Sequence, residues 1–125
     1  MHIEIPISLG ELLDKLSILM IKSEMISDKE KLKDVAIEER LLKGKVEALG
    51  IDSSELFEEL LQINKKLWKI EDDIREKERK DEFDKEFIEL ARSVYITNDQ
   101  RFDIKNRINL KFGSAIKEVK SYEEY

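Results

Sequence analysis

The sequence predicts an all-α domain, and three observations lead to this fold class. Charged residues make up 42% of the 125 residues and hydrophobic residues 41%, a mixture typical of helices with one buried and one solvated face. One proline and four glycines leave few turn residues for an all-β fold. Apolar residues also recur at alternating spacings of four and three, as in helices that pack on one another. The length predicts a single domain, residues 1–125, with five helices around one core.

The N-terminal segment predicts a short arm followed by a capped helix. Residues 2–7 alternate between polar and apolar, but Pro6 interrupts any β-ladder, so this segment is either a short edge strand or an extended arm. Ser8 and Glu11 form a capping box, which begins the first helix. This helix is expected to run to about Ile26.

The second and third helices are expected to dominate the fold. Ser27 to Glu30 is a capping signature for a helix that Gly50 ends, and a third helix follows from about Asp52 to Lys80. At about 1.5 Å per residue the third helix is roughly 40 Å long, more than a compact domain of this size needs. Because few residues join the two helices, we expect an antiparallel hairpin over residues 28–80. Its far end should pack on a second copy of the chain, so we expect a homodimer.

The C-terminal part of the chain predicts two shorter helices. One spans about residues 83–95, and Thr97-Asn98-Asp99 should break it and cap a fifth helix that ends at Phe112. Residues 114–125 are expected to dock as a short helix or an extended tail.

A stripe of mixed chemistry on the third helix is the first candidate site. It lies beside an apolar stripe, and its own residues are apolar at first and polar further along the helix. A polar group so close to a core should form hydrogen bonds within the protein or bind a ligand. Asn64, Trp68 and Arg75 could line a groove whose indole face and amide and guanidinium donors suit a sugar or an anionic small molecule. The alternative is an ordinary surface ion pair between Glu71 and Arg75, beside a tryptophan that covers the core.

A second candidate lies around the predicted break between the fourth and fifth helices. Four basic residues gather there inside an acidic protein: Arg92, Arg101, Lys105 and Arg107. Together with the free N–H groups of a helix cap they could hold a phosphate or carboxylate. The alternative is an ordinary basic face paired with acids of the long hairpin. We expect the two candidates to meet in one ligand-binding site. Its predicted residues are Asn64, Trp68, Glu71, Arg75, Arg92, Tyr95, Asn98, Asp99, Arg101 and Lys105.

Two further carboxylates lie on predicted buried or half-buried faces. Asp14 is most simply the flank of the first helix, paired with Lys22 eight residues later. Glu39 interrupts the apolar stripe of the second helix, and a buried carboxylate without a base is costly. Arg75 or Arg92 is therefore expected close to Glu39.

Several function classes are disfavoured by composition. The net charge of −6 argues against general nucleic-acid binding, which needs a basic surface. The chain has no cysteine and only one histidine, His2, so we expect no metal site and no cofactor. No Gly-rich phosphate loop or nucleophile elbow occurs. Without a signal peptide or a membrane-spanning stretch, the expected location is the cytoplasm.

The chain resembles a family of short, uncharacterised bacterial and phage proteins that is known only as a domain of unknown function. The resembling segments cover nearly the whole chain: Ile5-Pro6-Ile7-Ser8, Gly10-Glu11-Leu12, Asp14-Lys15, Asn64, Leu67-Trp68, Ile70-Glu71-Asp72, Ile74-Arg75, Phe87-Ile88, Leu90-Ala91-Arg92, Val94-Tyr95, Asn98-Asp99, Arg101, Ile104-Lys105, Ile108-Asn109, Gly113-Ser114 and Lys120-Ser121-Tyr122. The resemblance implies no reaction. Members are often encoded among surface-polysaccharide genes, which implies a role near glycan or nucleotide-sugar handling.

Two functional hypotheses follow. The first is a non-catalytic accessory protein that binds a partner or a small ligand. The alternative is a small helical enzyme that acts on an anionic substrate. Such an enzyme could resemble chorismate mutases, although no arginine precedes Arg40 in this chain, or nucleotide pyrophosphohydrolases, to whose acidic motif Glu58-Glu59 and Glu71-Asp72-Asp73 are a poor fit. An enzyme would need a carboxylate with a raised pKa, such as Glu39 or Glu71, that faces the bases across a pocket.

Overall fold

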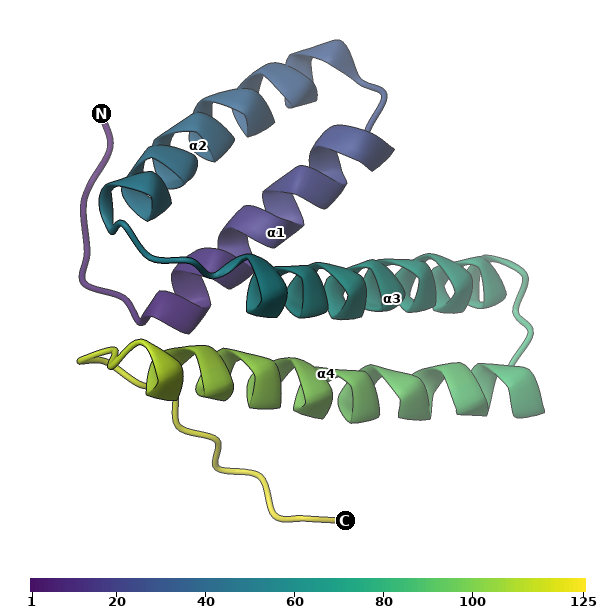
Figure 1. The fold of residues 1–125 in the computed structure, drawn as a ribbon. Helices are drawn as coiled ribbons and strands as arrows, with labels where there is room; N and C mark the ends of the chain where they lie inside the picture. The colour runs from purple at the N-terminus through teal and green to yellow at the C-terminus, as the bar shows by residue number, and fades with distance from the viewer.

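The computed structural model describes all 125 residues and contains four α-helices and no strand (Figure 1). The helices are α1 (Leu9–Met25), α2 (Lys29–Ala48), α3 (Ser54–Arg79) and α4 (Lys85–Lys111). The predicted all-α class is confirmed, with four helices in place of five. None of the four combines the length and the apolar composition that crossing a membrane requires.

The segment before Ser8 is an arm without regular secondary structure, so the edge strand does not form. The predicted cap is present, because the Ser8 Oγ accepts a hydrogen bond of 3.1 Å from the Glu11 backbone N–H. An exposed ion pair of 2.8 Å between Glu4 and Lys45 joins the arm to the C-terminal end of α2.

The helices pair as α1 with α2 and as α3 with α4, each antiparallel, and α1 lies across the α3–α4 pair (Figure 1). The predicted hairpin of residues 28–80 is therefore wrong, since α2 packs along α1 and does not pair with α3. The physical reason is that all three helix connections are short. Loop length alone permits a hairpin at each of them and does not select one.

The core forms where three helices meet, and α2 lies outside it. Five fully packed residues make up the core, one from α1 and two each from α3 and α4: Leu13, Leu56, Leu60, Ile104 and Ile108. No residue of α2 is buried. Its predicted apolar stripe is half-buried against α1 at every position except Leu49, which is 51% exposed.

The far end of α3 is covered by α4. In the distal half of the α3 stripe Ile70 is buried and Ile74 is half-buried. The apolar stripe that led us to expect a second copy there therefore already has a partner within the chain.

Helix α4 continues through the predicted break at residues 97–99. Thr97 is buried, the Asn98 Oδ1 accepts a hydrogen bond from Arg101, and Asp99 pairs with Lys120. Asn98 and Asp99 thus make contacts along and between elements, whereas the buried Thr97 hydroxyl has no hydrogen-bond partner. Each of the three costs a helix interior only a few tenths of a kcal/mol to about 0.7 kcal/mol. The true cap is Asp84, whose Oδ1 accepts a hydrogen bond of 3.0 Å from the Phe87 N–H.

A cluster of charges closes the turn between α3 and α4. The Lys77 ammonium lies 3.1 Å from Glu82, 3.0 Å from Asp84 and 3.1 Å from Glu86, with 14% of its side chain exposed. Hydrogen bonds with Asp84, Glu82 and Glu86 raise the pKa of Lys77. The Phe87 N–H and then Lys77 hold the pKa of Asp84 below its usual value.

The turn should make stability depend on pH through Asp84. A carboxyl whose pKa is lower in the folded state stabilises the fold above its unfolded pKa, and this contribution is lost as the pH falls through the folded pKa. Asp84→Asn keeps a good capping residue but removes the charge. We expect this variant to unfold at lower denaturant than wild type at pH 7, with the difference shrinking as the pH falls below the ordinary aspartate pKa of about 3.9. Asp103→Asn, at an exposed position without an ion pair, is the matched control. An offset between Asp84→Asn and wild type that stays equal as the pH falls would contradict this account.

Candidate functional site

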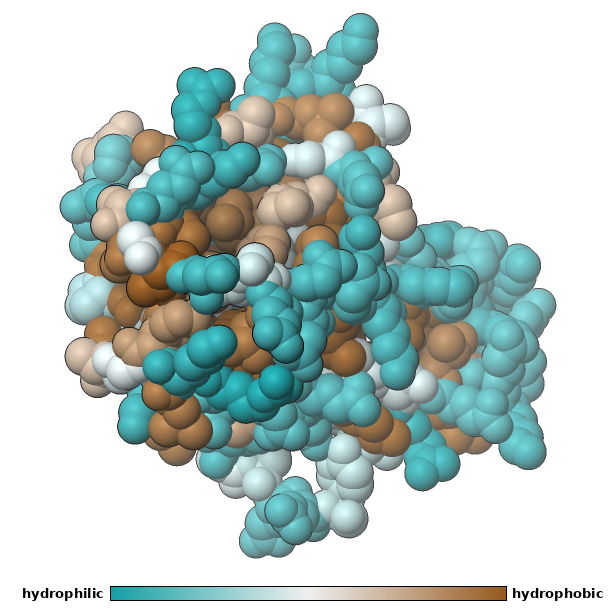
Figure 2. Space-filling view, in the orientation of Figure 1, coloured by the Kyte–Doolittle hydropathy of each residue, from teal (hydrophilic) through white to brown (hydrophobic).

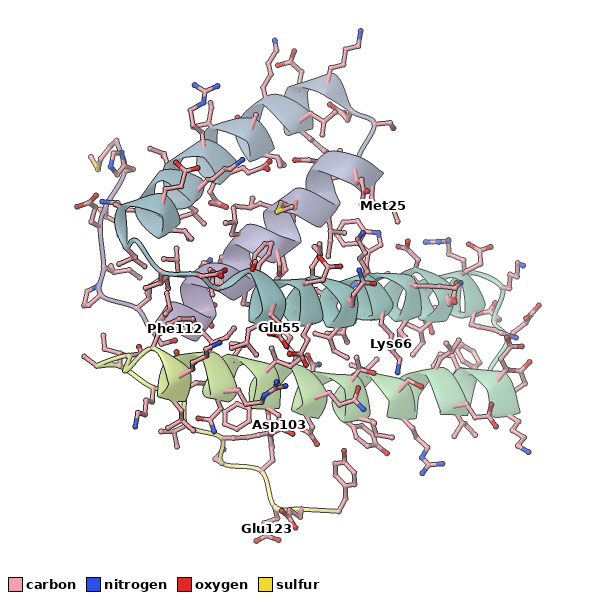
Figure 3. The ribbon with its side chains drawn as sticks, in the orientation of Figure 1. Met25, Glu55, Lys66, Asp103, Phe112 and Glu123 are labelled. Carbon is pink, nitrogen blue, oxygen red and sulfur yellow. The ribbon has the colours of Figure 1, made fainter.

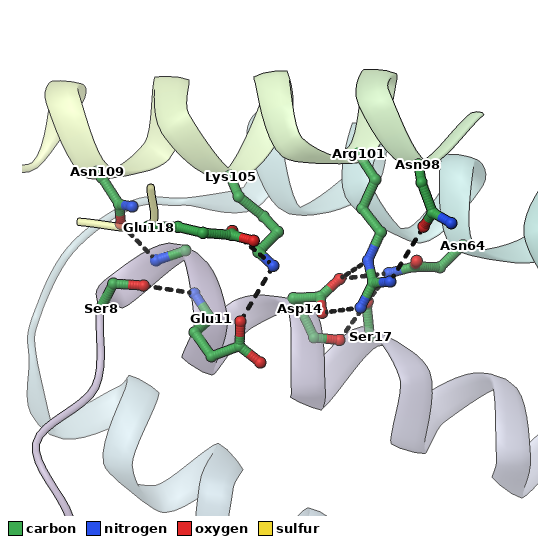
Figure 4. A network of polar contacts seen from close by, with 11 residues as sticks. Ser8, Glu11, Asp14, Ser17, Asn64, Asn98, Arg101, Lys105, Asn109 and Glu118 are labelled. Atoms are coloured by element: carbon green, nitrogen blue, oxygen red, sulfur yellow. Dashed lines mark hydrogen bonds and ion pairs between the residues drawn. The ribbon is translucent and has the colours of Figure 1, made fainter. Parts of the chain in front are cut away.

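A buried carboxylate, Asp14, joins three helices (Figure 4). Its side chain on α1 is 1% exposed. Arg101 of α4 donates from Nε to Oδ1 over 2.9 Å and also donates from Nη2 to Oδ2. Asn64 of α3 donates from Nδ2 to Asp14 Oδ1 over 2.9 Å and to the Ser17 Oγ over 2.7 Å. A bidentate pair with an added amide donor is the arrangement that lets a carboxylate stay charged in a core.

The helical period of α1 explains why polar groups reach the core. Gly10, Leu13, Asp14, Ser17 and Ile21 recur at helical spacing and are all buried. The Ser17 hydroxyl donates its hydrogen to the main-chain oxygen of Asp14 over 2.7 Å, and its oxygen accepts the hydrogen bond from Asn64. The hydrogen bond with Asp14 also raises the pKa of Arg101.

Lys105 forms a second buried contact one turn further along α4. Its side chain is 7% exposed, and its ammonium lies 3.0 Å from Glu11 and 2.8 Å from Glu118. Burial lowers the pKa of Lys105, but the hydrogen bonds with Glu118 and Glu11 outweigh burial and the net shift is upward. Lys105 therefore connects α4 to α1 and to the C-terminal segment.

The N-terminus of α1 lies directly on α4. The Gly10 N–H donates to the Asn109 Oδ1 over 2.7 Å, and the Leu9 N–H donates to the Ser114 Oγ over 3.1 Å. These bonds satisfy donors that a helix start leaves free. A Cβ on Gly10 would lie 2.6 Å from the main-chain oxygen of Lys105, so only glycine allows this approach.

A pocket of about 390 Å³ lies between α4 and the C-terminal segment, residues 114–125. In Figure 3 this segment, where Glu123 is labelled, runs back alongside α4. Four α4 residues and five residues of the segment line the pocket: Asn98, Arg101, Phe102, Lys105, Glu118, Val119, Lys120, Ser121 and Tyr122. Lys120 pairs with Asp99, and its ammonium lies 5.2 Å from the centroid of the Phe102 ring. The lining thus holds three cations and one carboxylate.

The structure brings five of the predicted site residues together. Asn98, Arg101 and Lys105 line the pocket, Asp99 holds Lys120 at its edge, and Asn64 is linked to Arg101 through Asp14.

The other five predicted residues lie apart from this network. Glu71 and Arg75 form an exposed pair of 3.2 Å with each other. Arg92 is exposed, and Trp68 is half-buried. The Tyr95 ring packs edge-on against Tyr125, with centroids 5.3 Å apart.

One secondary expectation, a base close to Glu39, is corrected. No base lies at Glu39, which instead accepts a hydrogen bond of 2.8 Å from the Ser23 hydroxyl. Its half-buried place at the edge of the α1–α2 contact leaves it access to water, so the carboxylate needs no cation. Arg107 makes a bidentate pair with Glu59 at 2.9 and 3.0 Å. For Arg107 the alternative interpretation therefore holds, in which a basic residue of this face is paired with an acid.

Asp14 pairs with Arg101 and not with Lys22, so its predicted role as a salt-bridged flank is wrong. Glu11, expected only in the helix cap, and Glu118 are not among the predicted site residues. A signal for Asp14 was present, because Asp14 and Ser17 continue the helical period of Leu13 and Ile21 and so had to face the core. No comparable signal existed for Glu118, which lies in a segment without regular structure. No group of three or more potential metal-binding side chains occurs.

Removing the buried charge should destabilise the fold. Asp14→Asn leaves Arg101 in the core without its partner, and breaking a buried pair in this way costs about 3–5 kcal/mol. Glu71→Gln, in an exposed pair, is the control and should cost less than about 1 kcal/mol. Urea denaturation measures both. Equal unfolding free energies for the two variants would show that the Asp14 pair contributes no more than a surface pair.

The close approach of α1 to α4 should not tolerate a side chain at Gly10. Gly10→Ala would force the helix start away from the Lys105 carbonyl, and overpacking of this kind costs about 1–3 kcal/mol. Alanine otherwise favours helix over glycine, so an unchanged or raised melting temperature would mean that the two helices are not in this contact.

Comparison with known proteins identifies the family of the chain. No curated protein and no solved structure gives a significant match. One family model, described as "Family of unknown function (DUF6165)", matches residues 1–125. This agrees with the resemblance to a domain of unknown function noted from the sequence. Since the match covers the whole sequence, the chain belongs to the DUF6165 family.

Proposed function

We propose that this chain is a cytoplasmic, non-catalytic protein that binds a small anionic ligand between α4 and the C-terminal segment. The observation that carries the proposal is the lining of the pocket. Arg101, Lys105 and Lys120 face the same hollow, whereas Glu118 is the one carboxylate that lines it. Guanidinium and ammonium groups at one point of an acidic protein suit phosphate or carboxylate.

The guanidinium of Arg101 is held in place before any ligand arrives. Three of its five N–H groups are used by Asp14 and Asn98, and 27% of the side chain remains exposed. A cation fixed from behind by a buried carboxylate loses little freedom on binding. The two remaining N–H groups are available to an anion.

Lys105 supports the proposal through its partner Glu118. Glu118 belongs to a segment without regular structure, and its carboxylate is 39% exposed. A phosphate group, with more charge and more acceptor oxygens than a carboxylate, would take the place of Glu118 on the ammonium. Binding would then exchange one anion for another at a buried cation and would leave no charge unpaired.

The remaining lining suits a ligand larger than phosphate alone. The volume lies within the range of small-molecule sites, and Phe102 and Tyr122 add aromatic surface beside the Asn98 amide. Rings and hydroxyl groups of a sugar phosphate or nucleotide sugar match such a lining. The resemblance drawn from the sequence implies glycan or nucleotide-sugar handling, which is the same class of compound.

The position of the carboxylates favours binding over catalysis. Glu39 and Glu71, which an enzyme would need as a base, bond to Ser23 and Arg75 and lie outside the pocket. Hydrogen bonds lower the pKa values of the exposed carboxyl groups of Glu4, Asp52, Glu76 and Asp84, so none of these four suits the role of a base. A general base has its pKa raised toward neutrality.

Calorimetric titration with inorganic phosphate, glucose 1-phosphate and a nucleotide sugar tests the proposal. We expect saturable binding that Lys120→Gln weakens by about tenfold, the typical effect of one charged hydrogen bond. Glu118→Gln should tighten binding, because it releases Lys105. Lys69→Gln, in an exposed pair with Asp73 outside the pocket, is the control. Absence of binding by all three compounds, or equal affinities of wild type and Lys120→Gln, would overturn the proposal.

A further inference from the structure

The outer face of α2 carries an apolar stripe that no part of the chain covers. Ile37, Leu41, Gly44 and Ala48 recur at spacings of four, three and four, and all are exposed, Ile37 to 59% and Leu41 to 49%. At 100° per residue they lie opposite the stripe that packs on α1. A surface helix of a monomer normally presents charged residues on this side. The stripe is therefore a second apolar surface of α2, which the monomer leaves exposed.

The whole chain also exposes more surface than a compact monomer. Its accessible surface is 9042 Å², whereas a compact protein of 14.8 kDa exposes about 7,000 Å². The terminal segments contribute to the difference, and so does α2, which has no buried residue. A standard protein interface removes about 800 Å² from each partner, which this excess accommodates. Figure 2 shows apolar surface on the side of the molecule where α1 and α2 lie.

We infer that the outer face of α2 packs antiparallel on the outer face of α2 of a second copy. The stripe is self-complementary in that orientation. Large residues meet small ones, with Ile37 opposite Ala48 of the second copy and Leu41 opposite Gly44. Nothing within the chain lies within 4 Å of a Cβ built on Gly44, so this space is open. Alternation of large and small residues across a contact gives close packing.

The charges beside the stripe select the antiparallel orientation. With Leu41 and Ala48 as a positions and Ile37 and Gly44 as d positions, Glu38 and Lys45 are e positions and Arg40 and Glu47 are g positions. Antiparallel helices bring e next to e and g next to g. Glu38 then meets Lys45 of the second copy and Arg40 meets Glu47, each contact occurring twice by symmetry. A parallel pair brings Arg40 next to Lys45, which repel.

Three of these four charged groups, Glu38, Arg40 and Glu47, make no ion pair within the chain. The ion pairs of α2 are Lys33 with Glu30 and Lys45 with Glu4. The Lys45 pair with Glu4 leaves both side chains more than 60% exposed, so a second carboxylate can reach the ammonium. This pair also keeps the arm, with Ile3 and Ile5 exposed to 79% and 65%, next to the proposed contact.

Sedimentation equilibrium of the full chain tests the contact. Wild type should sediment at twice the 14.8 kDa chain mass. Leu41→Lys, which places two charges in the contact, should weaken association by about a hundredfold or more while circular dichroism stays helical. Ile88→Lys is the matched control, because Ile88 is an exposed apolar residue of α4, 55% exposed, and this variant should stay dimeric. A monomeric wild type, or a Leu41→Lys variant as dimeric as wild type, would overturn the inference.

Cysteine cross-linking tests the orientation, and the chain has no native cysteine to interfere. An equimolar mixture of Ile37→Cys and Ala48→Cys chains should oxidise to the mixed disulfide. Each variant alone should stay reduced. Disulfides within the separate Ile37→Cys sample would indicate a parallel pair and would overturn the antiparallel arrangement. Arg40→Glu should weaken association by about tenfold, and Arg40→Glu/Glu47→Arg should restore it.

Discussion

The bidentate pair between Asp14 and Arg101 is the contact on which the rest of the structure depends. It joins α1 to α4, and Asn64 extends it to α3, so all three core helices meet at one carboxylate. An apolar contact between helices tolerates small rotations and slides, whereas two parallel N–H···O bonds accept one geometry. A buried pair adds little net stability compared with apolar residues of the same volume. Its main effect is therefore on the register of α1 along the α3–α4 pair.

Once that register is set, the neighbouring contacts follow from helical spacing. Glu11 lies three residues before Asp14 and Lys105 four residues after Arg101, so the second pair forms beside the first. One further turn brings Gly10 against the Lys105 carbonyl and Asn109. The arginine that fixes α1 also lines the pocket. The fold and the proposed binding therefore depend on the same guanidinium, which is why a pocket variant is better made at Lys120 than at Arg101.

The sequence predicts local features of this fold well and its pairings poorly. The Ser8 cap and the half-buried stripe of α2 follow from patterns within a few residues of one another. The partner of Asp14 is 87 residues away, and no local pattern contains that information. The order of helix pairing was missed for the same reason. Three connections of similar length allow several hairpins, and only the packing of complete faces decides between them.

In the candidate site, too, local groupings of residues were predicted and contacts between helices were not. Asn98, Arg101 and Lys105 were predicted together because Asn98 lies in the expected helix cap and the two bases lie in the helix that follows it, and all three line one pocket. Glu71 and Arg75 were grouped with them because a polar pair beside a core seemed to need partners. A pair four residues apart on one helix satisfies itself, so α4 was not required. Likewise, Thr97 and Asp99 were assigned to a helix break, because the burial of Thr97 and the pairing of Asp99 with Lys120 could not be read from propensity.

The positions of α2 and the pocket would allow the proposed dimer contact and the proposed ligand site to be occupied at the same time. α2 and the C-terminal segment lie on opposite sides of the molecule (Figure 1), with α1 and the α3–α4 pair between them. A two-fold contact through α2 would leave both pockets of a dimer facing solvent, well away from the axis. It would also give α2 a second partner. A 20-residue helix with no buried residue is marginal on its own, and packing on both faces would supply the burial that α1 alone does not.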